Sequence, residues 1–174
     1  FYTIADTALV GQVLGAQALA AVGTASLVLS VIVNFFIGFS AGLSVLVSHL
    51  YGEKDYARLS ALVQSIFITV ALFAALFTAA GIILNEQLLA ALSTPAELIP
   101  AASLYLRTVL YGMLAQLLYN TASAILRALG NTTSALHYLA AAVVLNIALD
   151  VVLLIVIPCG IAGAATATVL AQYA

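Results

Sequence analysis

The sequence has very little charge. Of its 174 residues, four are lysine or arginine and six are aspartate or glutamate, so charged residues make up 6% of the chain. A soluble domain carries roughly 25% charged residues. Hydrophobic residues make up 66% of this chain. So few charged side chains cannot cover the surface of a soluble protein of this size, and most of the chain is predicted to face hydrocarbon.

The scarcity of other residue types excludes several classes of function. The single cysteine, Cys159, excludes a disulfide within the chain. His49 and His137 lack the spacing of metal ligands, and no serine stands in a plausible group with histidine and aspartate. We therefore expect no enzymatic activity and no cofactor. Basic residues are too few to hold a nucleic-acid backbone, so no nucleic-acid partner is expected.

Long apolar runs separated by short polar segments predict an all-α polytopic membrane protein. A spanning helix needs about 20 apolar residues. The stretch 7–52 contains no Asp, Glu, Lys or Arg, so it must turn, and the segment 11–17, rich in glycine and glutamine, is the expected turn. Strand-like alternation is absent from the sequence, which leaves helices as the structure compatible with lipid. The predicted helices cover residues 1–10 (partial), 20–50, 62–84, 101–126, 134–157 and 161–174 (partial).

Both ends of the chain lie inside apolar runs, so we expect the first and last helices to be truncated and the natural protein to be longer. Lysine and arginine in short loops indicate orientation, because cytoplasmic loops are enriched in them. The loops after the second and fourth predicted helices hold Lys54, Arg58 and Arg127, whereas the other loops hold neither residue type. The first set is predicted to be cytoplasmic. Arg107, inside the fourth helix, fits this rule less well.

Two aspartates lie in apolar surroundings. A charged side chain at the centre of a spanning helix costs roughly 2.5–3.5 kcal/mol on insertion scales, so such groups usually face a cavity or a partner. Asn146 precedes Asp150 by one helical turn, and both lie on one helix face. Together they suit a proton, a small cation or a hydrogen-bonded substrate, although Asp150 could instead bind a neighbouring helix. Asp6 lies near the predicted turn, where it is equally compatible with a solvated helix end.

The fourth predicted helix carries a stripe of polar and small residues at helical spacing. This stripe indicates either a cavity wall or packing between helices through small and hydrogen-bonding residues. Thr168 and Gln172 share a face of the last segment, where a lone threonine is more typical of packing. The stripe consists of Tyr105, Gly112, Gln116, Tyr119, Asn120 and Ser123.

The order of these segments resembles the multidrug and toxic compound extrusion (MATE) transporters. ADTALVGQVLGAQALAAVG resembles the exit of the first helix in that family, and GLSVLVSHLYGEKD the end of the second, although His49 stands where glutamine is common. AILRALGNT resembles the following cytoplasmic loop, and LNIALDVVLLI and GIAGAATATVLAQ resemble the fifth and sixth helices. The resemblance spans the whole chain.

This resemblance implies a fold of twelve helices in two six-helix lobes, of which the chain would be the N-terminal lobe with the C-terminal lobe absent. It also implies a cation-binding site in this lobe. Its carboxylates would be Asp6 and Asp150, and its supporting polar groups Asn146, Asn120, Tyr105 and Thr168. Gln116, Tyr119 and Ser123 are weaker candidates for a substrate cavity.

The function implied is secondary active efflux of amphipathic or cationic organic compounds from a bacterium, across its inner membrane, in exchange for protons or sodium. No metal other than sodium at the same cluster is expected. The missing lobe and the bilayer are the expected partners besides the organic substrate. Because the lobes are expected to rock against each other, one lobe alone should not transport.

Three other functions stay open. A flippase for lipid-linked oligosaccharide or peptidoglycan precursors belongs to the same superfamily, but holding a pyrophosphate favours a cavity rich in arginine and lysine. Only Arg107 lies well inside a predicted helix here. A non-transporting membrane scaffold would tolerate neutral residues at both aspartates. A channel is a further alternative, although the sequence contains no recognisable filter.

Overall fold

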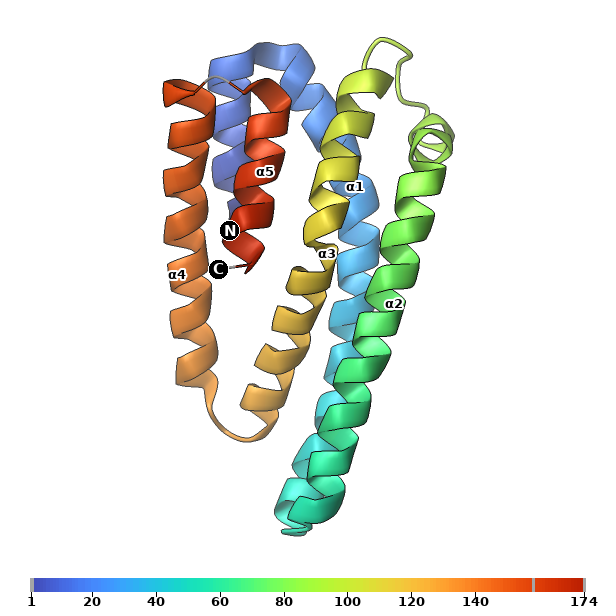
Figure 1. Ribbon diagram of the computed structural model, residues 1–174, viewed down its shortest axis with the longest axis vertical. Coiled ribbons are helices and arrows are strands. Elements are labelled where there is room, and N and C mark those ends of the chain that lie inside the picture. Colours follow the sequence, from blue (N-terminus) through green and yellow to red (C-terminus); the bar gives the residue numbers. More distant parts are fainter. Residues whose placement is uncertain (1, 158, 174) are drawn as a thin grey trace.

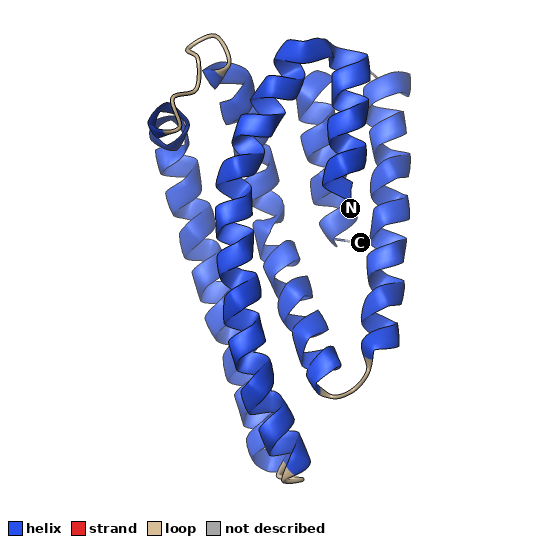
Figure 2. Cartoon of the chain, turned by 180° about the vertical axis from the view of Figure 1, so that it is seen from behind, coloured by secondary structure: helices blue, strands red, loops and turns tan. Residues whose placement is uncertain are grey.

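The computed structural model describes residues 2–157 and 159–173, with the side chains of residues 2–6 and of Ala8 outside this description. The regular secondary structure of the described part is all helical, with loops joining the helices (Figures 1 and 2). The helices are α1 (Tyr2–Gly52), α2 (Tyr56–Ala91), α3 (Ile99–Ala128), α4 (Thr132–Val151) and α5 (Gly160–Tyr173). A short π-helix, η1 (Val152–Val156), continues α4.

Gly15 divides α1 into two arms. Its φ of 85° and ψ of −178° are not helical, and a positive φ is a conformation that glycine adopts without steric cost. Figure 1 shows the first arm, in dark blue, rising beside α4 and α5, and the second arm running down past α3 to the loop before α2. The break falls inside the segment 11–17 in which the sequence predicts a turn.

Local capping fixes the turns between the helices. Asp55 caps α2, since its side chain accepts a hydrogen bond from the Arg58 backbone N–H at 3.0 Å. Asn131 caps α4 in the same way, accepting from the Ser134 N–H at 3.2 Å. Gly130, with a φ of 84°, turns the chain between α3 and α4. These short connections bring consecutive helices side by side.

The helix boundaries extend past the charge-free runs. α2 covers Tyr56–Ala91, beyond the predicted 62–84 at both ends, because the capped and solvated turns of a helix tolerate polar residues. The predicted helix 134–157 is α-helical up to Val151 and then widens into η1, where the Ile157 N–H donates to the Val152 carbonyl oxygen at 2.8 Å. This i→i−5 bond is the mark of a π-helix.

Four helices in the described part of the chain are long and apolar enough to cross a membrane, namely Leu9–Gly52, Tyr56–Ala91, Ile99–Ala128 and Thr132–Val156. Their outward faces are apolar: Val31 is 71% exposed and Ile83 is 77% exposed. Such surfaces are stable only against lipid, since a soluble monomer rarely exposes large contiguous apolar patches. The chain is therefore a multi-pass membrane protein.

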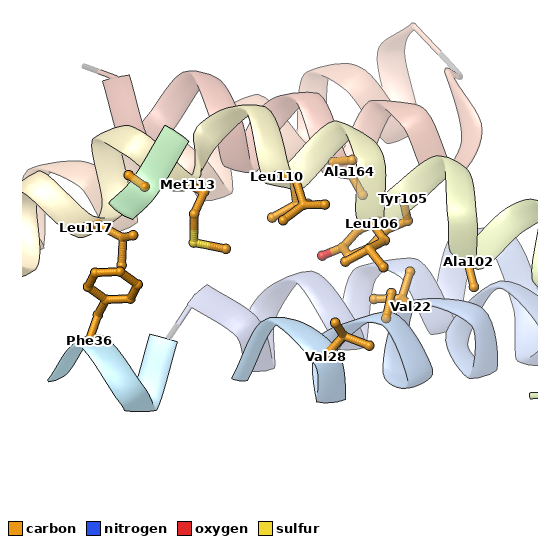
Figure 3. Close-up of a cluster of buried hydrophobic side chains, with 14 of the residues drawn as sticks. Val22, Val28, Phe36, Ala102, Tyr105, Leu106, Leu110, Met113, Leu117 and Ala164 are labelled. Carbon is orange, nitrogen blue, oxygen red and sulfur yellow. The ribbon is translucent and has the colours of Figure 1, made fainter. Parts of the chain in front are cut away.

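α3 is the central helix and the most buried of the four. Its apolar face packs against α1, where Phe36 points toward Leu117 and Val22 lies near Leu106 (Figure 3). On the side of α2, Phe77 contacts Phe36 with ring centroids 5.5 Å apart. A Cβ on Gly81 would come within 2.8 Å of Leu110, so this glycine lets α2 and α3 approach closely. The core therefore forms along α3.

Candidate binding site between α3, α4 and α5

The buried side of α4 is polar. Ala135, Asn146 and Asp150 are the residues of α4 that are buried. Asn146 is 1% exposed and Asp150 is 0% exposed, whereas Val144 on the opposite side is 68% exposed. A helix that turns apolar residues to lipid and an amide and a carboxyl group inward is typical of a polar site within a membrane protein. The spacing of four residues, which predicts one shared face, is realised in the structure.

A cavity of about 260 Å³ lies next to this face, between α3, α4 and α5. Four predicted site residues meet there: Asn146 from α4, Thr168 from α5, and Gln116 and Tyr119 from α3. Its remaining walls are mostly apolar, as in most sites for small organic molecules. The rest of the lining is Tyr138, Leu139, Ala141, Ala142, Leu145, Ala171 and Gln172.

Most polar groups around this cavity bond to the protein itself. The Tyr119 hydroxyl donates to the Ala135 carbonyl oxygen at 3.0 Å, which ties α3 to α4. The Thr168 hydroxyl donates to the Ala164 carbonyl oxygen one turn earlier, at 3.0 Å. The Gln172 amide donates to the side-chain oxygen of Gln116, which ties α5 to α3. The Tyr119 and Gln172 bonds join the three helices around the cavity, whereas the Thr168 bond lies within α5.

Asn146 differs even from Gln172, whose side-chain oxygen lacks a partner among the described residues but whose nitrogen is bonded. Neither the side-chain oxygen nor the side-chain nitrogen of Asn146 has a hydrogen-bond partner among the described residues, although both atoms are buried. Leaving a buried polar group without a partner costs roughly 1–3 kcal/mol. Because Asn146 also lines the cavity, its amide is placed to bind whatever enters it. Donor and acceptor are both available, so a cation or a hydrogen-bonding organic group could bind there.

A glycine on α3 makes room for the link to α5. A Cβ on Gly112 would lie 2.0 Å from the side-chain oxygen of Gln172, closer than any side chain allows. Gln172 therefore reaches Gln116 past a position that has no side chain, and a side chain at position 112 would require Gln172 to shift. The sequence places Gly112 in the polar stripe and Gln172 on the face of Thr168, but it does not show that the two positions meet.

The other predicted site residues lie elsewhere or outside the description. Tyr105 is 5% exposed and packs within the hydrophobic core along α3. Ser123 is buried, and Asp150 is buried one turn beyond Asn146, away from the cavity lining. Asp6 belongs to the first arm of α1, but its side chain lies outside the described residues.

Asn120 lies in a second cavity of about 300 Å³, between α1 and the end of α3. This cavity is lined from α1 by Ile37, Ser40, Ala41 and Ser44, and from α3 by Asn120, Ala124, Arg127 and Ala128. The polar stripe of α3 thus divides between two cavities, because residues 116 and 119 face α4 and α5, whereas residue 120 faces α1.

Arg107, which fits the orientation rule poorly, has a partner. Its guanidinium group lies 3.4 Å from the Glu86 carboxylate near the end of α2, and the two side chains are 48% and 66% exposed. The pair places Arg107 at the surface near the predicted outer side. The described residues contain no group of three or more His, Cys, Asp or Glu side chains that could hold a metal ion.

Comparison with known proteins identifies the family. The MatE family model matches residues 1–152. The chain belongs to the MatE family. It is 35% identical over 167 residues to the probable multidrug resistance protein YpnP of Bacillus subtilis (strain 168), a match that covers 96% of this chain and 38% of YpnP. This MatE chain therefore spans well under half the length of that relative.

Solved structures agree with this assignment. The chain superposes on the inward-facing conformation of a multidrug resistance MATE family transporter of the MOP superfamily with a TM-score of 0.92, at 26% identity and over 99% of this chain and 39% of the other. On the outward-facing conformation the TM-score is 0.91, again at 26% identity, over 99% of this chain and 38% of the other. The all-α membrane fold and the family predicted from the sequence are both confirmed.

Proposed function

We propose that the full-length protein containing this MatE chain is a secondary active exporter of amphipathic or cationic organic compounds, driven by exchange for protons or sodium across the bacterial inner membrane. The observation that carries the proposal is the buried pair on α4: Asn146 faces the cavity with an unsatisfied amide among the described residues, and Asp150 is fully buried one turn away. Family membership and the relatives described as multidrug resistance proteins support it.

The proposed coupling site centres on Asp150 and Asn146, with Thr168 from α5 lining the same cavity as Asn146. A carboxyl group and an amide oxygen are ligands suited to a proton or to a hard cation such as sodium. Asp6 and Tyr105 remain proposed members by resemblance. Asn120 lies in the second cavity. It is therefore proposed to influence the cation site indirectly, through the position of α3, and not as a ligand.

The cavity between α3, α4 and α5 is proposed to admit the organic substrate. Tyr119, Tyr138 and the aliphatic lining would contact its apolar part, and Gln116 its polar part. Ser123 is buried outside this lining, so it is not proposed to contact the substrate directly. A flippase is less supported, because neither arginine nor lysine is among the described residues that line this cavity.

Cation binding can drive export only if the two conformations of the transporter bind the ion unequally. The nearly equal TM-scores to inward- and outward-facing relatives are consistent with a lobe that moves as one body. We therefore expect the two lobes to rock against each other while the internal packing of this lobe is retained.

The test uses the full-length protein in an efflux-deficient bacterium and in vesicles under an imposed proton or sodium gradient. Efflux of a fluorescent cationic dye is measured for wild type, Asp150→Asn and Asp6→Asn. Asp55→Asn is the matched control, because Asp55 caps α2 in a loop and asparagine caps equally well. We expect Asp150→Asn to lower gradient-driven efflux by about tenfold or more.

Efflux driven by only one of the two gradients would name the coupling ion. Wild-type efflux that Asp150→Asn and Asp6→Asn both leave unchanged would overturn the coupling site. Wild type that moves no dye under either gradient would overturn the proposed export of cations, and lipid-linked precursors would then be tested as substrates.

A further inference from the structure

The second cavity, between α1 and α3, is chemically different from the first. Its two helix faces contribute residues at helical spacing: Ile37, Ser40, Ala41 and Ser44 from α1, and Asn120, Ala124, Arg127 and Ala128 from α3. Alanine or serine side chains occur on both faces and predominate on that of α1. The cavity of about 300 Å³ thus lies at the end of the helix pair that the sequence predicts to be cytoplasmic.

The polar groups of this cavity that have no partner among the described residues are hydrogen-bond donors. The side-chain nitrogen of Asn120 is buried and has no acceptor among the described residues. Arg127 has no carboxylate within ion-pair distance in the part of the chain that the structure describes, unlike Arg58 with Asp55 at 3.4 Å and Arg107 with Glu86 at 3.4 Å. A buried amide N–H and a guanidinium group that line one cavity favour a shared acceptor, and an oxyanion can accept from both.

The serine hydroxyl groups that line the cavity form hydrogen bonds within the protein. Ser40 and Thr121 share a hydrogen bond of 3.3 Å across the two helices. Ser44 donates to the Ala41 carbonyl oxygen at 2.7 Å. Acidic side chains are absent from the described lining, so nothing in it repels an anion.

We propose that the cavity between α1 and α3 binds a phosphate group, through Arg127 and the Asn120 amide. The occupant expected at this depth is the phosphate of an anionic lipid, since basic pockets between membrane helices on the cytoplasmic side bind lipid headgroups. A free phosphate ion offers the same chemistry. The site uses neither Asp150 nor Asn146, and lipid binding is measured without a cation gradient.

The test measures binding of phosphatidylglycerol to the purified full-length protein in non-ionic detergent, by native mass spectrometry over a lipid titration. Arg127→Gln is compared with Arg58→Gln, which removes the same charge from an exposed arginine on the same predicted side but outside the cavity. Both arginines are exposed, so both variants should fold. We expect Arg127→Gln to weaken lipid binding by about fivefold relative to Arg58→Gln.

A second variant, Asn120→Asp, adds a carboxylate that repels the anion and offers Arg127 an internal partner. It should weaken binding by about tenfold or more. In a further arm, millimolar inorganic phosphate is added to the wild type. Displacement of the lipid would assign the site to free phosphate, and no displacement would assign it to the lipid.

Equal lipid binding by Arg127→Gln and Arg58→Gln would overturn the proposal. In that case Arg127 would serve only the last turn of α3, where a cation is favoured by the helix dipole. Undiminished binding to Asn120→Asp would also contradict it, because the donor that the anion needs would be gone.

Discussion

Asn85 and Asn146 are two buried asparagines in membrane-spanning helices, and they differ in one respect. Asn85 on α2 is 0% exposed; its amide nitrogen donates to the Ile82 carbonyl oxygen at 3.0 Å, and its oxygen accepts from the Ser103 hydroxyl at 2.8 Å. Asn146 on α4 is 1% exposed and has neither bond among the described residues. Residue type and burial therefore do not distinguish the two asparagines, whereas hydrogen-bond satisfaction does, and the unsatisfied one is the residue proposed to bind a ligand.

The difference also follows from where the two side chains lie. Asn85 faces α3, where Ser103 is placed to bind it, so the pair holds two helices together. Asn146 faces a cavity. A satisfied amide contributes to stability, while an unsatisfied one at a cavity lowers stability unless a ligand binds it.

The largest effect is expected from Asn146→Leu. We expect gradient-driven dye efflux by the full-length protein to fall by about tenfold or more, because a cavity ligand is lost. Stability should stay unchanged or rise, since a buried polar group without a partner is replaced by an apolar one of similar size. Efflux assays measure the first quantity, and thermal unfolding in detergent measures the second. Efflux at the wild-type rate would contradict the proposed difference in role between Asn85 and Asn146.

The reverse is expected for Asn85→Leu. This substitution should lower the free energy of unfolding by about 1–3 kcal/mol, because Ser103 and the Ile82 carbonyl group lose a buried partner. Efflux per folded molecule should remain near that of wild type. Denaturant titration in mixed micelles measures the first quantity, and efflux normalised to folded protein measures the second; a large efflux loss without destabilisation would contradict the assignment.

Gln172 lies between the two cases, since its nitrogen donates to Gln116 while its oxygen has no partner among the described residues. Gln172→Leu should therefore lower the free energy of unfolding by about 0.6 kcal/mol, a typical value for a hydrogen bond between membrane helices and less than the loss expected for Asn85→Leu. The same micelle titration measures it. Destabilisation as large as that of Asn85→Leu would show that satisfaction of the side chain does not rank these amides.

The sequence by itself was sufficient to predict that the chain lies in lipid, that it is helical and which family it belongs to. Scarcity of charge and the length of the apolar runs require membrane-spanning helices, because lipid offers no hydrogen bonds to an unpaired backbone. The glycine-rich segment around Gly15 indicated the break in α1. Spacing alone placed Asn146 and Asp150 on one face of α4, since helical periodicity is a local property.

Only the tertiary structure decided what each face meets. Periodicity places a residue on its own helix but does not say which neighbouring helix lies opposite. For that reason, the sequence does not show that the polar stripe of α3 lines two different cavities. It also does not show that Arg107 lies beside Glu86, or that Gly112 lies beside Gln172. The partner of Asn85, and the lack of one for Asn146 among the described residues, depend likewise on contacts between helices, which local sequence does not encode.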